Sequence, residues 1–142
     1  MKSTTIASLV TIRFQQHDGK EGSLTVIPDE GPNGLGLAIR RVFTITNVPA
    51  GGLRGNHAHR DCTQVVVCLR GRVSIEVDDA RNSIMVMLEN AGEGLSIPPG
   101  LWNKLTLEGP DTVLAVFCDQ PYTESDYLRD RNEYEVFKGV RS

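Results

Sequence analysis

Short apolar runs separated by turn-forming residues recur along the chain, and they constrain its fold more than any other feature. The 14 glycines and 7 prolines among the 142 residues fall between these runs. Residues 72–78 alternate polar and apolar side chains, which predicts a strand with one face in the core. Residues 64–69 are almost continuously apolar, which predicts a strand buried on both faces. Further strands are expected at residues 9–14, 23–27, 38–48, 83–88, 95–97, 102–107 and 112–118.

A closed all-β architecture follows from so many short strands in a chain of this length. The polar stretch 17–22 reads as a turn between the first two strands. Near the end of the chain, Ser125 is expected to cap a helix over residues 126–137. We therefore predict a single domain over residues 1–142, a cupin or jelly-roll β-barrel with a short C-terminal helix.

Charge and hydropathy exclude several classes of partner. Fifteen basic and eighteen acidic residues give a net charge of −3, which lacks the field that drives generic nucleic-acid binding. No apolar run approaches the roughly 20 residues that span a bilayer, and the first residues do not read as a signal peptide. Three cysteines without a CxxC pair predict neither a zinc centre nor a disulfide, and they fit a cytoplasmic protein.

Two of the three histidines in the chain lie two residues apart, at His57 and His59. In a strand, side chains two apart project from the same face, so the two imidazoles are expected side by side. Such a pair either holds a metal or moves protons near neutral pH. The alternative is a structural role, with both rings satisfied by backbone groups in the core.

The histidine pair sits inside a pattern similar to the first motif of the cupin superfamily. Gly51, His57, His59 and Gly71 keep its spacing, but Gln64 stands where metal-binding cupins carry a glutamate. Neutral amides are poor ligands beside imidazole and carboxylate.

The second cupin motif also keeps its glycine and proline positions, at Gly92, Pro98 and Gly100, and it departs at one residue. Asn103 replaces the third ligand histidine. With two amides in the ligand positions we assign no metal residue and no cofactor, which argues against a metal-dependent oxygenase and favours acid–base chemistry by His57 and His59.

Two arginines and one aromatic residue complete the candidate site. Arg54 lies between glycines just before the histidines, where a guanidinium can clamp a phosphate or carboxylate. Arg41 shares a strand face with Phe43 and is expected to face a partner or a ligand cavity. Trp102, the one tryptophan, either stacks on a ligand or packs in the barrel.

With these residues in view, the chain resembles the metal-independent sugar-nucleotide 3,4-ketoisomerases. The resemblance rests on four matches that cover nearly the full length: residues 41–43, residues 54–59 with 64–71, residues 98–102 and residues 122–130. It implies that the keto group of a dTDP-4-keto-6-deoxyhexose moves from carbon 4 to carbon 3 through an enediol. It also implies a homodimer that works in deoxyamino-sugar biosynthesis, whose subunits often exchange N-terminal strands in this family.

Roles for individual residues follow from the same resemblance. His57 is expected to be the base, with His59 as the proton shuttle or orienting partner. We expect substrate binding by Arg41, Arg54, Gln64, Trp102 and Asn103. Two alternatives keep the same substrate class: an epimerase that uses the same proton abstraction, and a sugar-nucleotide-binding protein without catalysis.

Three positions depart from the family pattern. Phe43 stands where the family commonly has a tyrosine, Asn103 where it often has a histidine, and Glu21 where it often has an arginine. These departures suggest altered product stereochemistry, a different nucleotide sugar or weakened catalysis.

Overall fold

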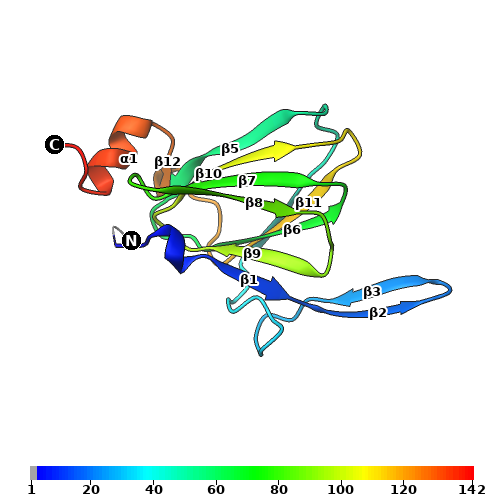
Figure 1. Cartoon of the computed structure of the whole chain (residues 1–142). Coiled ribbons are helices and arrows are strands. Elements are labelled where there is room, and N and C mark those ends of the chain that lie inside the picture. Colours follow the sequence, from blue (N-terminus) through cyan, green and yellow to red (C-terminus); the bar gives the residue numbers. More distant parts are fainter. Residues whose placement is uncertain (1–2) are drawn as a thin grey trace.

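Two five-stranded antiparallel sheets pack face to face in the computed structural model, which describes residues 3–142 (Figure 1). The first sheet has the order β1-β9-β6-β11-β4 and the second β12-β5-β10-β7-β8, and β2 and β3 form a separate hairpin. The strands are β1 (Val10–Arg13), β2 (Gln15–Gly19), β3 (Gly22–Val26), β4 (Arg41–Ile45), β5 (Gly52–His59), β6 (Gln64–Arg70), β7 (Val73–Asp78), β8 (Ser83–Leu88), β9 (Glu93–Ile97), β10 (Trp102–Leu107), β11 (Val113–Cys118) and β12 (Tyr127–Leu128). This confirms the predicted all-β jelly roll with a short C-terminal helix, α1 (Arg131–Phe137).

The core lies between the two sheets, and the strand patterns explain how it forms. On β7, Val73, Ile75 and Val77 point inward and are fully buried, as the alternation predicts. On β6, Val66 packs in this core, whereas Val65 joins a second cluster on the outer face of the first sheet. Both predicted burial patterns, half-exposed for β7 and two-sided for β6, are confirmed.

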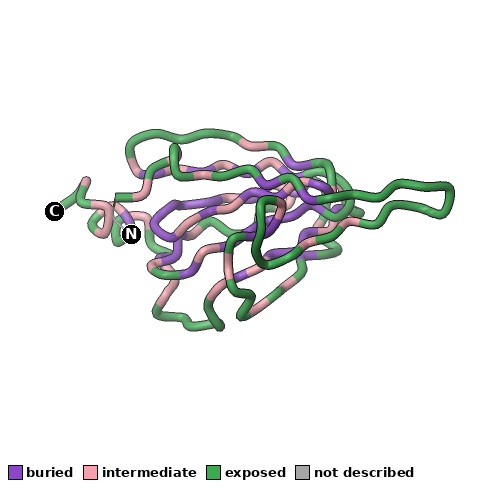
Figure 2. The backbone as a smooth tube through the Cα atoms, turned by 90° about the horizontal axis from the view of Figure 1, so that it is seen from below, coloured by how far each residue is buried: buried purple, intermediate pink, exposed green. Residues whose placement is uncertain are grey.

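The hairpin of β2 and β3 differs from the sequence prediction. Residues 17–22 were expected to form a turn, but the strands extend to Gly19 and resume at Gly22, so that Lys20 and Glu21 alone make the loop. The hairpin extends away from the sheets and is exposed along almost its whole length (Figure 2). Because neither face is buried, the segment shows no apolar alternation, and the sequence pattern could not reveal β2.

The C-terminal segment also differs from the prediction. Ser125 does not cap a helix: residues Glu124–Asp126 form a short 3-10 turn, β12 follows, and α1 begins only after Asp130. The carboxylate of Asp130 caps α1 by accepting hydrogen bonds from the backbone N–H groups of Asn132 and Glu133. The segment therefore reaches the second sheet as a strand, and β12 pairs with the end of β5.

One helix side chain anchors α1 to the barrel. Tyr134 is fully buried, packs against Trp102 at a ring-centroid distance of 5.2 Å, and joins a cluster with Ala58 and Leu128. Its hydroxyl lies 3.0 Å from the carbonyl oxygen of Asp78 and 2.9 Å from that of Gly100. Within residues 3–142, no helix has the length and apolar character needed to cross a membrane.

We expect Tyr134→Phe to lower the free energy of unfolding by about 1–2 kcal/mol, because it removes the donor that two buried carbonyl groups share. Urea denaturation of both proteins measures the difference. Tyr122→Phe is the control, since Tyr122 is exposed and should change stability by less than about 0.5 kcal/mol. Equal losses in the two variants would contradict this anchoring role.

Candidate active site

A β-bulge in β5 determines which side chains face the barrel interior. Asn103 pairs with His57 and Lys104 with Gly55, so Asn56 is the extra residue that opposes no partner. Gly55 and Asn56 both have positive φ, of 78° and 68°, as this irregular backbone requires. In a regular strand, Arg54 and His57 would point to opposite faces. The extra residue changes that parity, and both line the same cavity.

The two predicted histidines do lie side by side. Their ring centroids are 5.0 Å apart and the rings are nearly perpendicular. The ring of Tyr127, from β12, lies against both, with centroid distances of 5.0 Å to His57 and 4.4 Å to His59. His59 is almost fully buried, whereas His57 is half-buried and faces the cavity.

Burial keeps both imidazoles neutral at pH 7. Desolvation, with smaller contributions from the nearby His59 and Arg129, lowers the pKa of His57 to about 4. Desolvation also lowers the pKa of His59, although the carboxylate of Asp126 opposes that effect. A neutral imidazole carries a free lone pair, so His57 is able to accept a proton at neutral pH.

A carboxylate holds His59 in one orientation. Asp126 Oδ2 lies 2.7 Å from His59 Nδ1, and Asp126 Oδ1 accepts the backbone N–H of Asp61 at 2.6 Å. Because a carboxylate accepts hydrogen bonds, this contact places the proton of neutral His59 on Nδ1 and leaves Nε2 as the bare nitrogen. Sequence reasoning missed Asp126, since it lies 67 residues away in the segment that was predicted to be helical.

The cavity itself has a volume of about 210 Å³ and lies between the sheets at the β5 and β4 side. Its wall is mixed, with apolar side chains on one part and polar groups on another. The lining residues are Phe43, Ile45, Arg54, Gly55, His57, Gln64, Val66, Asn103, Leu105, Val116, Tyr127 and Arg129. At this size the cavity admits a sugar-sized ring but not a whole nucleotide, since drug-sized ligands occupy pockets of about 300 Å³ or more.

Arg41 lies beside the cavity, on the same face of β4 as Phe43. Its Nη2 lies 3.6 Å from Cys118 Sγ and 3.5 Å from the hydroxyl of Tyr127, and its guanidinium lies 5.5 Å from the ring centroid of Phe43. The neighbouring thiol of Cys62 and the guanidinium of Arg41 lower the pKa of the Cys118 thiol.

Arg129, which the sequence analysis did not single out, stacks on Tyr127 with its guanidinium 4.2 Å from the ring centroid. Its Nε and Nη2 donate to Glu124 at 2.7 and 3.1 Å, and Glu124 also accepts from the hydroxyl of Tyr122. These residues belong to the segment 122–130, and the resemblance of that segment to the ketoisomerases was the one sequence signal that they contribute to the site. The expected helix concealed which of them face the cavity.

Four buried side-chain atoms have no hydrogen-bond partner within residues 3–142, and all four belong to predicted site residues. They are Arg41 Nε, His57 Nδ1, His59 Nε2 and Asn103 Nδ2. Buried polar atoms are almost always paired in folded proteins, because an unpaired one costs free energy. His57 and Asn103 line the cavity, and Arg41 and His59 lie beside it, against the lining residue Tyr127. This grouping of unpaired polar atoms indicates a site built for a polar ligand.

Gln64 and Asn103 line the cavity where metal-binding cupins hold two of their ligands, and both contribute neutral amides. Gln64 Nε2 donates to Cys118 Sγ at 3.6 Å. Trp102 lies elsewhere: it is buried against Tyr134, and its Nε1 donates to Asn56 Oδ1 at 3.1 Å. The structure therefore favours the packing interpretation of Trp102 over ligand stacking.

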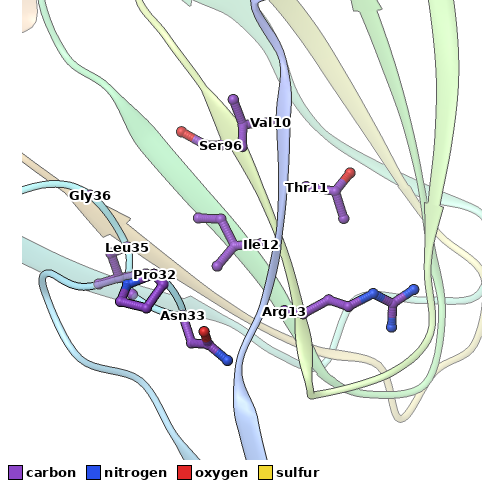
Figure 3. A pocket seen from close by; sticks show the side chains of 10 residues that line it. Val10, Thr11, Ile12, Arg13, Pro32, Asn33, Leu35, Gly36 and Ser96 are labelled. Carbon is purple, nitrogen blue, oxygen red and sulfur yellow. The ribbon is translucent and has the colours of Figure 1, made fainter.

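A second groove, of about 660 Å³, runs between β1 and the loop 32–36 on the outside of the first sheet (Figure 3). Arg13 is the one charged residue of its lining, and Val10, Ile12, Pro32 and Leu35 supply apolar surface. This groove lacks an acid–base pair, so we place the chemistry in the barrel cavity.

Comparison with known proteins finds one matching family and a curated relative that covers most of the chain. Residues 5–139 match the family described as FdtA: WxcM-like, C-terminal. The chain is 32% identical over 127 residues to TDP-4-oxo-6-deoxy-alpha-D-glucose-3,4-oxoisomerase of Aneurinibacillus thermoaerophilus, covering 89% of this chain and 88% of that protein.

Among solved structures, the sugar 3,4-ketoisomerase QdtA from Thermoanaerobacterium thermosaccharolyticum in complex with TDP is 30% identical. It superposes with a TM-score of 0.82 and covers 92% of this chain and 93% of QdtA. A histidine-to-asparagine mutant of QdtA in complex with TDP-4-keto-6-deoxyglucose is 28% identical, with a TM-score of 0.82 and coverage of 95% and 94%.

The lowered pKa of His57 makes stability depend on pH. The unfolded chain binds a proton at a pKa near 6.5 and the folded one only near 4, so falling pH favours unfolding between these values. We expect the free energy of unfolding at pH 4, relative to pH 7, to fall by about 3 kcal/mol more in the wild type than in His57→Asn.

Denaturant titrations across this pH range measure the difference. His17→Asn is the matched histidine control, because His17 lies on the exposed hairpin, away from the barrel cavity. Parallel curves for the wild type and His57→Asn would contradict a neutral, buried His57.

Proposed function

Because the chain belongs to the FdtA family, whose model matches residues 5–139, we propose that it is a sugar-nucleotide 3,4-ketoisomerase acting on a TDP-linked 4-keto-6-deoxyhexose. The observation that carries this proposal is the set of unpartnered polar atoms on His57 and Asn103, which line a sugar-sized cavity, and on Arg41 and His59, which lie beside it against Tyr127. Relatives named as a 3,4-oxoisomerase and a 3,4-ketoisomerase favour the isomerase hypothesis over the epimerase hypothesis.

In the proposed reaction, His57 removes the proton from carbon 3 of the sugar, which is acidic because it neighbours the ketone at carbon 4. The ketone oxygen gains a proton, so that an enediol forms across carbons 3 and 4. The hydroxyl at carbon 3 then loses its proton and carbon 4 is protonated, which leaves the ketone at carbon 3. No atom or electron is lost, so the reaction needs proton carriers alone, and His57 is neutral at pH 7 as a base must be.

His59 is the proposed second proton carrier, and Asp126 is its positioning residue. The contact between His59 Nδ1 and Asp126 directs the bare Nε2 away from the carboxylate, so Nε2 is free to accept a proton. The negative charge of Asp126 also stabilises the imidazolium that forms. Proton exchange between the two imidazoles over a ring-centroid distance of 5.0 Å then needs one bridging group, which substrate hydroxyls supply.

Substrate binding divides between the cavity and its mouth. Asn103 Nδ2, which has no protein partner, donates to a sugar oxygen, and Gln64 lies on the same wall. The exposed Arg54 and the cavity-lining Arg129 offer guanidinium groups to the diphosphate, the geometry that arginine suits best. Phe43 contributes apolar surface to the cavity, so any hydroxyl needed there comes instead from Tyr127.

The deciding experiment is proton NMR of the metal-free protein with dTDP-4-keto-6-deoxyglucose in deuterium oxide, with chelator present. We expect new signals of a 3-keto sugar that carries deuterium at carbon 4. Substrate re-formed from the enediol should carry deuterium at carbon 3. His57→Asn should slow both by about 10²–10⁴-fold, the usual contribution of a general base. Asn82→Ala, which alters an exposed residue in the turn between β7 and β8, serves as the control and should keep full activity.

Other outcomes identify the alternatives. Deuterium uptake without a 3-keto product would indicate an epimerase. Binding without any exchange, seen as line broadening, would indicate a sugar-nucleotide-binding protein and would rule out catalysis on this substrate.

The proposal includes a homodimer, which the exposed hairpin supports. Leu24 and Val26 on β3 are 62% and 41% exposed, and Val10 on the neighbouring edge strand β1 is 55% exposed. An isolated two-stranded hairpin is marginally stable in water, and an unpaired edge strand invites another strand. A second copy of this chain that supplies the complementary edge would bury these apolar side chains at both sites at once.

We expect the wild type to sediment as a dimer and the double variant Leu24→Lys with Val26→Lys to sediment as a folded monomer in analytical ultracentrifugation. Met85→Lys is the control, because Met85 is 59% exposed on β8 of the other sheet. A monomeric wild type would reject the homodimer. If Met85→Lys broke the dimer and the hairpin variant did not, the interface would lie at β8 and not at the hairpin.

A further inference from the structure

Three buried side chains that are able to ligate a metal lie close together at His59. His59, Cys62 and Asp126 each offer a donor atom, and these atoms all lie within 4.8 Å of one another. His59 and Cys62 are only 3% and 2% exposed, and the side chain of Asp126 is 11% exposed. They come from the end of β5, from the turn that follows it, and from the 3-10 turn Glu124–Asp126.

The donor set differs in kind from the amide-containing set in the cavity. Imidazole nitrogen, thiolate sulfur and carboxylate oxygen are the three donors that tetrahedral Zn²⁺ takes from proteins, with a fourth position left for water. Cys62 and Asp126, once deprotonated, carry two negative charges that balance a dication in a buried place. In the cavity, Gln64 and Asn103 provide no such charge.

Asp126 also connects this cluster to the surface. It lines a depression of about 240 Å³ together with Asp61, Gln120 and Thr123, among others. None of the residues that line this depression lines the barrel cavity. A cation therefore reaches Asp126, the outermost of the three ligands, from solvent without crossing the barrel cavity.

We propose that His59, Cys62 and Asp126 form a binding site for a thiophilic divalent cation such as Zn²⁺, and that its occupation inhibits the enzyme. Binding releases the thiol proton of Cys62 to solvent. If the cation takes Nδ1 of His59, the ring proton moves to Nε2; if it takes Nε2, that nitrogen is blocked. In both cases His59 loses the bare nitrogen that accepts a proton. The binding stands independently of the proposed reaction, whereas the inhibition rests on it.

Cadmium is the probe, because thiolate ligation to Cd²⁺ gives an ultraviolet charge-transfer band. We expect chelator-treated wild-type protein to develop this band with one equivalent of Cd²⁺ and to lose it when Zn²⁺ competes. Cys62→Ser should abolish the band, and Cys68→Ser, which alters another buried cysteine on β6, should retain it. Asp126→Asn, which keeps the thiol but replaces a charged carboxylate ligand with a neutral amide, should weaken binding. A band that survives in Cys62→Ser, or its absence in the wild type, would overturn the site.

Isomerase assays complete the test. Without metal, Cys62→Ser and Cys68→Ser should both match the wild type, which also shows that each is folded. The Zn²⁺ concentration for half-inhibition should rise about 100-fold or more in Cys62→Ser and stay unchanged in Cys68→Ser. Zn²⁺ inhibition that is equal in all three proteins would overturn the regulatory role. A Cd²⁺ band without any isomerase activity would leave the site standing and reject the proposed reaction instead.

Discussion

The pairing of β5 with β10 on one side and with β12 on the other holds the site together, because every proposed proton carrier depends on it. On the β10 side, the bulge at Gly55 and Asn56 places the side chain of Arg54 on the same side of the sheet as that of His57. A Cβ atom at Gly55 would lie 2.9 Å from Asn103 Oδ1, and the positive φ of 78° adds strain for other residues. On the β12 side, Tyr127 pairs directly with His59, which brings Asp126 to the imidazole. Main-chain geometry therefore positions the acid–base groups, and the apolar core between the sheets keeps that geometry rigid.

Electrostatics in the site contrast with the charge of the whole protein. The net charge is −3, yet Arg41, Arg54 and Arg129 gather at or beside the cavity. Arg41 lies against the ring of Phe43 and Arg129 stacks on Tyr127, which keeps both guanidinium groups in place. Arg129 is also ion-paired with Glu124, whereas Arg41 has no carboxylate partner among its hydrogen-bond contacts in residues 3–142. A diphosphate would therefore meet local positive charge, and its own negative charge would raise the pKa of His57 from its low value toward that of a more effective base.

Sequence patterns predicted the parts of the fold that have one buried face or two. The strands β8 and β10 match their expected ranges, and the pairing of His57 with His59 follows from strand geometry alone. The pattern failed where burial is absent or where backbone geometry is irregular. The exposed β2 carries no apolar signal, and the bulge at Asn56 interrupts the alternation that would have related Arg54 to His57.

Long-range pairing explains the functional residues that were missed. Asp126 and Tyr127 act through contacts with a strand nearly seventy residues earlier, and no local pattern encodes such a contact. Acidic residues and an apolar stripe in this segment also suit a helix, and α1 does form, but only from Arg131 onward. The family resemblance covered the segment without indicating which of its side chains reach His59.

This order of elements has a consequence for biosynthesis. The ribosome makes β5, with both imidazoles, long before it makes the 3-10 turn and β12 that complete the site. Until residues 124–128 emerge and dock, His59 lacks its carboxylate and the edge of β5 lacks its neighbour. A nascent chain stalled before that point would hold a nearly complete barrel with an incomplete acid–base pair. The proposed chemistry thus requires the docking of the C-terminal segment, which packs on the barrel end through Leu128 and Tyr134.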